Sequence, residues 1–398
     1  MTFKVLIILI SQGLVKAIQR ELNHFFGALQ GETYDIHEVT KGALTQARAK
    51  LKPEAFIELY QAALPGFYEG AAYNKWKGHR LLAIDGSIIN LPSHPSVEEE
   101  FGAHQVGCKA DVQRSMGTVS LCYDVLNLVT LDARLDKFTT SEPALLQTHL
   151  KQVNFLEQDL LLLDRGYPST ALMYELNQKT IDFCMRLRMN WKDAKIMCDT
   201  GQTDKEIVYR LPTKNRNLLK KYNSTSDSVR VRLVVVELDN GELEILCTSL
   251  LDKVQYPHSC FKELYHHRWV AEEGYKLLKC RVELEVFSGK TAHAVKQDFY
   301  AKVFMMVMCA ILSFPIAEQI KKESESKQRK HNHQINRTNA LGFLRQCWIT
   351  LWLHEKTELL LQALSKALKN STDIIRPGRS FERKHRSKKP PSMTYKHL

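Results

Sequence analysis

Two short apolar runs that each end in an aspartate constrain the fold of this chain most. Asp85 follows the run LLAI, and Asp164 follows the run LLLL. Such runs are typical of strands buried on both faces of a sheet, where a carboxylate is costly unless it is paired or binds a metal. Gly86 and Gly166 follow closely and would let the backbone approach a bound group. One such aspartate alone would suit an ordinary turn, but two on neighbouring strands favour a functional pair.

The segments around these runs alternate between strand and helix patterns. The run LLAIDGSIINLP, interrupted by one acid, and two strands with a turn near Asn127 precede a helix that Ser141 would cap. The Asp164 run is followed by a helix and by another apolar strand, IDFCMRLR. This order predicts an α/β layout with a mixed sheet. Three further strand-like runs, EIVYRL, SVRVRLVVVEL and ELEILCTSL, with a hairpin turn at DNG, predict an all-β insertion.

A third carboxylate lies on a predicted amphipathic helix, YHHRWVAEEGYKLLK. At about 100° per residue, its aromatic, its cations and one carboxylate share a face. These residues are Tyr265, Arg268, Glu272, Lys276 and Lys279. The opposite face is small and apolar, so it would pack on the sheet. A solvated face with i,i+4 ion pairs is the alternative, but it does not need an aromatic residue in line with the charges.

Basic residues exceed acidic ones by 56 to 44, and the net charge of +12 is concentrated at the carboxyl end. Residues 376–398 hold eight Lys and Arg residues against the single Glu382, which is seven of the twelve net charges. A concentrated basic tail favours a polyanionic partner, nucleic acid first and an anionic membrane second. A tail that only aids solubility is the alternative.

Cysteine usage and hydropathy indicate the compartment. The nine cysteines are scattered and never spaced as C-x-x-C, which favours reduced thiols over a disulfide framework or a zinc site. The apolar run at 5–10 is short for a signal peptide, and the stretch at 303–315 is short for a membrane span. The sequence therefore predicts a soluble cytoplasmic protein without a membrane partner.

Three carboxylates at one edge of a mixed sheet suit hard divalent cations, because Mg²⁺ and Mn²⁺ prefer oxygen ligands. Two such ions about 4 Å apart activate a water or a 3′-hydroxyl and stabilise the leaving oxygen of a phosphodiester. Flanking Arg and Lys side chains would bind phosphates, and Tyr265 would stack on a base. The predicted chemistry agrees with the basic charge.

A family resemblance follows from these residues. The motif Y-x2-R-x3-E-x6-K, from Tyr265 to Lys279, is similar to the Y-R-E-K motif of transposases of the insertion-sequence-four family. Asp85 within IDGS and Asp164 within LDRGY resemble the first and second catalytic aspartates of that family. The separation of 108 residues between Asp164 and Glu272, and the basic tail with RPGRSFERK, also resemble its layout. The resemblance covers nearly the whole chain.

This resemblance implies an α/β fold with an RNase H-like mixed-sheet catalytic domain, an inserted all-β subdomain, and helical N-terminal and C-terminal regions. The C-terminal region would hold a linker over 321–339 and one helix over about 340–368. The expected domains are a helical DNA-binding region at 1–78, the catalytic domain at 79–320 with its β-insertion at about 192–255, the helical C-terminal region at 321–375, and the basic tail at 376–398.

The resemblance also implies a Mg²⁺-dependent DDE transposase that cuts element ends and joins them to target DNA. Asp85, Asp164 and Glu272 would be the catalytic residues and would hold two Mg²⁺ ions, with Mn²⁺ able to substitute. Trp191 is a candidate for a base-flipping pocket. The residues expected to bind DNA are Tyr265, Arg268, Lys276, Lys279, Arg379, Arg383 and Lys384.

Double-stranded DNA, as element ends and as target, is the expected partner. A homodimer formed through the C-terminal helices is expected in the DNA complex. The expected location is the bacterial cytosol, near the nucleoid, and no small-molecule substrate is expected. Two alternatives stay open: an RNase H-like nuclease without strand transfer, and a catalytically inactive or regulatory DNA-binding relic. The presence of all three carboxylates argues against the relic.

Overall fold

The structure is a computed structural model that describes residues 1–105, 113–326, 331–353 and 357–376 of the chain. The chain divides into two compact units, each assembled from separate stretches of sequence. The first unit comprises Met1–Glu69, Asn90–Ser115 and Leu277–Leu398, and the second comprises Gly70–Ile89 and Met116–Lys276. The domain boundaries expected from the sequence stay predictions.

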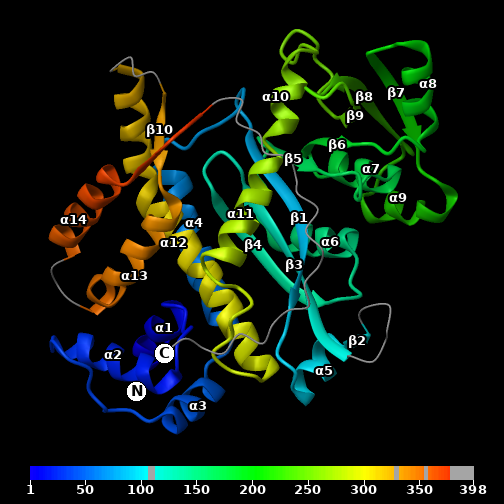
Figure 1. Cartoon of the computed structure of the whole chain (residues 1–398). Helices are drawn as coiled ribbons and strands as arrows, with labels where there is room; N and C mark the ends of the chain where they lie inside the picture. Colours follow the sequence, from blue (N-terminus) through cyan, green and yellow to red (C-terminus); the bar gives the residue numbers. More distant parts are fainter. Residues whose placement is uncertain (106–112, 327–330, 354–356, 377–398) are drawn as a thin grey trace. The chain divides into compact units, whose positions relative to one another are not determined.

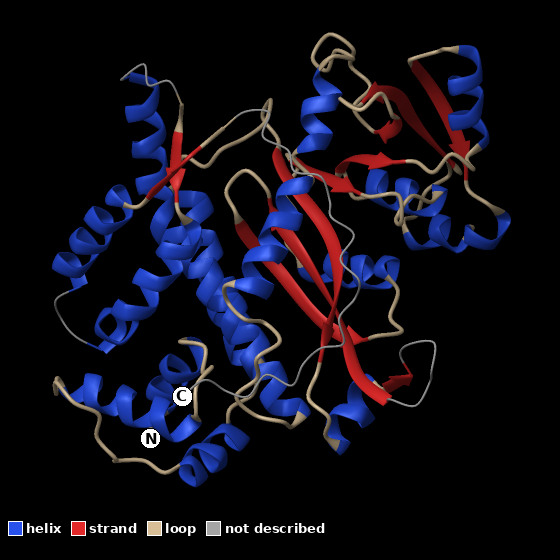
Figure 2. Cartoon of the chain, viewed as in Figure 1, coloured by secondary structure: helices blue, strands red, loops and turns tan. Residues whose placement is uncertain are grey.

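A mixed sheet has most of its strands in the second unit (Figures 1 and 2), although its short strand at Ala103–Gln105 is part of the first. Its strands are β1 Arg80–Asn90, β2 Ala103–Gln105, β3 Gln113–Asp124, β4 Val129–Lys137, β5 Asp159–Leu163, β6 Asp182–Arg186, β7 Asp204–Arg210, β8 Ser228–Glu237 and β9 Leu243–Thr248. Within the described residues their order is β2-β3-β1-β5-β6-β9-β8-β7, and β4 also pairs with β3. β5 pairs in parallel with both β1 and β6, whereas β3–β4 and β8–β9 are antiparallel. The predicted α/β class with a mixed sheet is confirmed.

The two apolar runs form adjacent parallel strands. Leu81–Ile84 and Leu160–Leu163 are at most 1% exposed and lie in register, with Ile84 opposite Leu163. Strands covered on both faces need continuous apolar sequence, which is why neither run alternates with polar residues. The next residue after each run is an aspartate, so the register brings Asp85 and Asp164 to the same edge of the sheet.

Helices cover this sheet and connect its strands. They are α6 Glu142–Gln152, α7 Thr170–Gln178, α8 Lys192–Thr200, α9 Asn217–Lys221, α10 Cys260–His266 and α11 Trp269–Cys280, with a 3-10 turn at Thr213–Asn215. Ser141 caps α6 as predicted, since its side chain accepts a hydrogen bond from the Ala144 amide. Figure 1 shows α11 running along β1, β3 and β4.

The predicted all-β character of the insertion at 192–255 is wrong. The three expected strands form as β7, β8 and β9, and the hairpin turns at Gly241 with φ +80°. However, α8 and α9 lie in the same segment, and β9 pairs with β6, so these strands extend the main sheet. The nine residues of α8 are too few to show a clear helical period. The helix is instead stabilised by burial of Ala194 and Met197.

Helices dominate the first unit. They are α1 Phe3–Ser11, α2 Ile18–Gln30, α3 Lys41–Lys50, α4 Glu54–Gly70, α5 Pro95–Phe101, α12 Ala292–Ser326, α13 Arg337–Leu353 and α14 Thr357–Asn370. A small antiparallel sheet joins β10 His333–Ile335 and β11 Thr372–Ile374. The predicted linker at 321–339 thus contains the end of α12 and a strand. The predicted helix over 340–368 is two helices.

The apolar N-terminal run forms a core helix. Ile8, Leu9 and Ile10 of α1 are at most 4% exposed. The Trp348 indole of α13 is fully buried and donates a hydrogen bond to the Ser11 hydroxyl at 2.7 Å. Burial in this unit therefore explains why the segment is so apolar.

By length and composition, α12 is able to cross a membrane, but 61% of its most apolar 18-residue window is buried within the structure. Such burial is the pattern of a helix in a protein core. The helix α12 packs on α1, α13 and α14 within the same unit.

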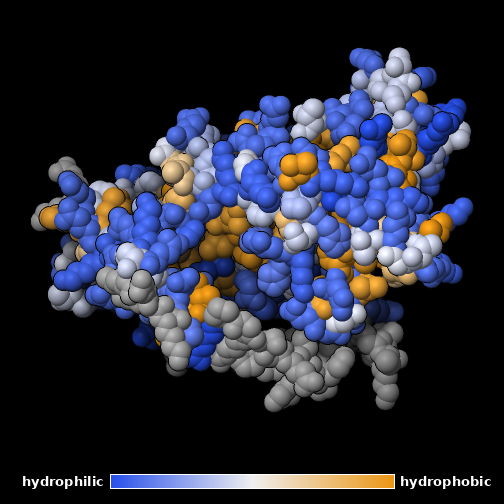
Figure 3. Space-filling model, turned by 90° about the horizontal axis from the view of Figure 1, so that it is seen from above, coloured by the Kyte–Doolittle hydropathy of each residue, from blue (hydrophilic) through white to orange (hydrophobic). Residues whose placement is uncertain are grey.

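The face of the molecule in Figure 3 carries mainly hydrophilic side chains.

Candidate active site

Asp85 and Asp164 occupy corresponding positions at one edge of the sheet, each directly after a residue of the Ile84–Leu163 pair. Both are half-buried. One carboxylate oxygen of Asp85 accepts a hydrogen bond from the Gly86 amide at 2.9 Å, which holds this carboxylate against its own backbone.

Two contacts hold α11 against the sheet beside Asp85. A Cβ at Gly274 would lie 3.3 Å from the ring of Tyr123, so the absence of a side chain lets the helix approach β3 closely. The Tyr275 hydroxyl then donates to the Asp85 carbonyl at 2.7 Å. Glu272 lies nearly one turn earlier on this helix, and its charge acts on Asp85.

The predicted single helix through the Y-R-E-K motif is two helices. α10 ends at His266 and α11 begins at Trp269, and Arg268 lies in the turn between them. Arg268 is only 4% exposed, so the alternative of a solvated helix face does not hold for this residue. The turn directs its guanidinium inward, where carboxylates attract it.

The motif residues still lie together around Arg268. Its guanidinium carbon is 5.6 Å from the ring centre of Tyr265, and its Nη2 is 3.4 Å from Glu272 Oε1. The Tyr265 hydroxyl lies 3.4 Å from Asp164 Oδ1. Because Tyr265 is 3% exposed, its contact in this structure is with Asp164, and its expected DNA contact stays a prediction.

Arg268 is the central cation of the site. Burial lowers the pKa of its guanidinium, but Tyr265, Asp164, Asp85 and Glu272 raise it, and the net pKa is raised. Its buried Nε has no hydrogen-bond partner in the part of the chain that the structure describes. Arg268 therefore stays charged and retains a donor for a ligand.

A fourth carboxylate, which the sequence did not single out, lies beside the two aspartates. Glu142 is the first residue of α6 and is half-buried. Its side chain lies within 3.5 Å of the position that a Cβ would take at Gly86 or at Gly166. In the sequence Glu142 has the pattern of an ordinary first-turn acid after a Ser cap. The sequence feature that pointed to a further group at the site is the pair of glycines, Gly86 and Gly166, because glycine leaves room for another group beside each aspartate.

A buried polar chain links the helix of Glu142 to the strand of Asp85. The Asp132 carboxylate binds Nδ1 of His149 at 2.7 Å, and His149 Nε2 lies 2.9 Å from the Ser120 hydroxyl, which donates to the Asp85 carbonyl at 3.2 Å. These three side chains resemble a hydrolytic triad but are at most 1% exposed. Since substrate cannot reach them, their role is to fix α6, β3 and β4 around Asp85.

The electrostatics of the site indicate mutual repulsion of its carboxylates. Burial raises the pKa of Asp85 to about 6; the Gly86 amide and Arg268 lower it, and the charges of Glu142 and Glu272 raise it. Burial and Asp164 likewise raise the pKa of Glu142, with Arg188 offsetting part of the effect. A cation would relieve this repulsion.

The donor set fits a hard divalent cation, because it consists of carboxylate oxygens with a buried tyrosine hydroxyl beside them. That hydroxyl, on Tyr167, is without a hydrogen-bond partner among the described residues. No group of three His, Cys, Asp or Glu side chains in the described ranges is already close enough to hold a metal. Side-chain rotation would therefore have to accompany ion binding.

Asp85→Asn is expected to stabilise the ion-free protein at pH 7.5. The rise of the pKa from 3.8 to about 6 corresponds to about 3 kcal/mol against the ionised form. The folded pKa exceeds the unfolded one, so the gain should be complete above pH 6 and vanish below about pH 4, where both states are protonated. Urea unfolding of both proteins from pH 4 to 8 with EDTA measures this. A variant less stable than wild type at pH 7.5 would contradict it.

The remaining predicted residues are less closely tied to the carboxylates. Lys276 is exposed and pairs with Glu273 on its own helix. Lys279 is half-buried, and burial lowers its pKa although Glu285 raises it in part. Trp191 precedes α8 and contacts Tyr209 edge-on at 5.5 Å. Three predicted residues lie outside the described ranges: Arg379, Arg383 and Lys384.

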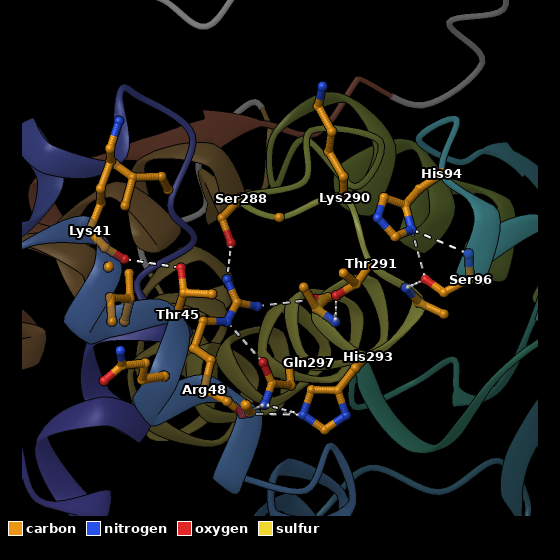
Figure 4. A pocket seen from close by; sticks show the side chains of 18 of the residues that line it. Lys41, Thr45, Arg48, His94, Ser96, Ser288, Lys290, Thr291, His293 and Gln297 are labelled. Carbon is orange, nitrogen blue, oxygen red and sulfur yellow. Dashed lines mark hydrogen bonds between the residues drawn. The ribbon is translucent and has the colours of Figure 1, made fainter.

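A cavity of about 1310 Å³ lies in the first unit, and none of the proposed catalytic residues lines it (Figure 4). Arg48 lines this cavity. It donates a hydrogen bond to Gln297 at 2.8 Å and forms an ion pair with Asp298 at 2.8 Å. The side chains of Arg48 and Asp298 are 8% and 5% exposed. Its guanidinium is engaged with the protein, so we assign this arginine a structural role.

Comparison with known proteins identifies the family. Residues 76–309, more than half of the chain, match the family described as "Transposase DDE domain". The chain belongs to this family. The matched range contains Asp85, Asp164, Glu272 and Glu142.

A relative from Escherichia coli (strain K12) is similar over most of the chain. "Transposase InsG for insertion sequence element IS4" is 24% identical over 287 residues, which cover 71% of this chain and 63% of the relative. The chain thus spans less than two thirds of the length of that relative. The predicted resemblance to insertion-sequence-four transposases is confirmed by the family match and by this relative.

One solved structure shows a weak likeness. "Cryo-EM structure of piggyBac transposase synaptic complex with hairpin DNA (SNHP)" has a TM-score of 0.40 and 11% identity, covering 76% of this chain and 59% of that chain. This similarity is too low to bear on the fold.

Proposed function

We propose that this chain is the DNA transposase of an insertion sequence. It would bind terminal inverted repeats, cut phosphodiester bonds at the element ends and join them to target DNA. The observation that carries this proposal is the placement of Asp85 and Asp164 directly after the last residue pair that joins the parallel strands β1 and β5, with Glu272 on a helix anchored to Asp85 by Tyr275. An RNase H-like catalytic domain is the finer fold that we propose for this sheet.

Asp85, Asp164 and Glu272 would hold two Mg²⁺ ions, with Mn²⁺ as a substitute. When bound, such ions activate a water or 3′-hydroxyl and stabilise the leaving oxygen of the phosphodiester. Asp85 would keep its orientation through the Gly86 amide, and Asp164 through the Tyr265 hydroxyl. The orientation of these oxygen ligands matters because phosphodiester chemistry depends mainly on positioning and charge stabilisation.

Arg268 would stabilise negative charge on the scissile phosphate. Its guanidinium contacts Glu272, and its guanidinium carbon lies 5.6 Å from the ring centre of Tyr265 and 5.0 Å from that of Trp269. A planar guanidinium suits this role because it offers several donors to the oxygens of a phosphate.

The wider DNA contacts are part of the same proposal. Lys276, Lys279 and the basic tail would bind phosphates of the duplex, and the strongly basic net charge of +12 supports a polyanionic partner. We also propose that the protein acts as a homodimer on DNA and that it is located in the cytosol, associated with the nucleoid.

Cleavage at the DNA ends of its own element tests the proposal. The substrate is a labelled duplex carrying the inverted repeat that flanks the gene, incubated with Mg²⁺ and target plasmid. Wild type should nick at the repeat boundary and form labelled strand-transfer products, whereas Asp164→Asn should do neither. Cleavage without strand transfer would favour the nuclease alternative. Binding without cleavage by wild type would favour the inactive relic.

A further inference from the structure

Glu142 lies between the two strand ends that carry the aspartates. A Cβ at Gly86 would be 3.1 Å from its Oε1, and a Cβ at Gly166 would be 2.9 Å from its Oε2. Gly86 is adjacent to Asp85, and Gly166 is two residues beyond Asp164. Each carboxylate oxygen of Glu142 therefore faces the backbone next to a different aspartate.

The position of Glu142 is fixed by its helix. Ser141 caps α6 through a hydrogen bond from the Ala144 amide, and two turns later His149 of the same helix joins the buried chain from Asp132 to Ser120. Since Ser120 donates to the Asp85 carbonyl, the same chain sets both Asp85 and the start of α6. Hydrogen bonds of this kind are typical of residues that hold a metal ligand in place.

An ordinary first-turn acid is the simplest alternative, because a carboxylate at a helix N-terminus is favoured by the helix dipole. That role requires only a solvated side chain. Glu142 is instead half-buried and turned toward two carboxylates of the same charge. The dipole alone does not explain this direction.

An independent observation indicates a missing ligand at the same place. Tyr167 is 2% exposed, and its hydroxyl has no hydrogen-bond partner in the described structure. The charges of Glu142, Asp85 and Asp164 all act on this phenol, and Arg268 acts on it with the opposite sign. A buried polar hydroxyl without a partner requires an explanation such as a bound ion or water.

We infer that Glu142 is a fourth carboxylate ligand of the divalent ion held by Asp85 and Asp164, with the Tyr167 hydroxyl beside the ion or its water. This inference rests on the proposed function. Gly86 and Gly166 lack side chains because the Glu142 carboxylate needs the space over both of them. The site is thus built from four acids on four segments: the middle of β1, the end of β5, α6 and α11.

Manganese binding by the full-length protein, measured by electron paramagnetic resonance of free Mn²⁺, tests the inference. Loss of a residue that only hydrogen-bonds to a metal ligand lowers metal affinity by about 10–100-fold. Loss of a ligand itself should matter at least as much, so Glu142→Gln and Asp85→Asn should each weaken Mn²⁺ binding at least about tenfold. The matched control is Glu157→Gln, which removes an exposed carboxylate of the same unit and should bind Mn²⁺ like wild type.

Gly166→Ala supplies a second route to the same question. Its Cβ would displace the Glu142 carboxylate, so it should weaken Mn²⁺ binding in the wild-type background but have no further effect with Glu142→Gln. If Glu142→Gln binds normally while Asp85→Asn is weakened, the inference is wrong and the proposed metal site stands. If wild type binds no Mn²⁺, both are wrong.

Discussion

Glu272→Gln is expected to lower cleavage at the element ends by at least about a thousandfold and to leave DNA affinity within about twofold. The change removes one charged metal ligand but keeps the length and shape of the side chain. Losing about 4 kcal/mol of charge stabilisation in the transition state corresponds to this factor. DNA affinity depends on phosphate contacts, which Glu272 as an anion does not make. Single-turnover cleavage of a labelled end, beside gel-shift titration at one salt concentration, measures both quantities.

Glu273→Gln is the matched control for this experiment. Glu273 is the next residue on α11, is 59% exposed and pairs with Lys276 on the surface. The same chemical change there should leave cleavage within about twofold, because exposed pairs contribute little. Normal cleavage by Glu272→Gln would remove Glu272 from the triad. Equal losses in both variants would indicate damage to the helix and not to a ligand.

The sequence predicted the part of the site that depends on strands. Continuous apolar runs are a strong signal for parallel strands buried on both faces, and the residue that ends each run is then placed by register. Asp85 and Asp164 could be found in this way without any long-range information. Their shared edge follows from the pairing of Ile84 with Leu163.

The residues that depend on helices were harder to place. Periodicity predicted that Arg268 lies on one face of a continuous helix, yet it lies in a turn between two helices and is 4% exposed. Glu142 has the pattern of a first-turn acid, and its direction depends on how α6 docks, through His149, on strands far along the chain. Local sequence does not record such tertiary contacts, so a functional acid and a capping acid look alike.

Local sequence patterns also did not predict how the chain divides into two compact units. The first unit joins three separate stretches, and its core contains contacts such as Trp348 with Ser11, 337 positions apart. Composition changes along a chain indicate where elements change type. They do not indicate which distant elements share a core.

Asp159→Asn is expected to destabilise the protein by about 3–5 kcal/mol, the largest stability effect among these predictions. Arg80 and Asp159 form the first residue pair between β1 and β5, whereas Asp85 and Asp164 follow the last pair, and the guanidinium and carboxylate of Arg80 and Asp159 meet in two hydrogen bonds of 2.7 and 2.6 Å. Their side chains are 3% and 0% exposed, so water cannot replace the lost charge. Urea unfolding followed by circular dichroism measures the change in unfolding free energy.

Two further variants separate this structural pair from the functional one. Arg80→Met combined with Asp159→Asn should recover a large part of the loss, because it removes the buried cation along with its partner. Asp164→Asn, at the other end of β5, should change the unfolding free energy by less than about 1 kcal/mol, since an amide oxygen can still accept the 3.4 Å hydrogen bond from Tyr265. A strongly destabilised Asp164→Asn beside a stable Asp159→Asn would reverse the assignment of the two strand ends. The expected pattern instead makes one end of the paired strands responsible for stability and the other for chemistry.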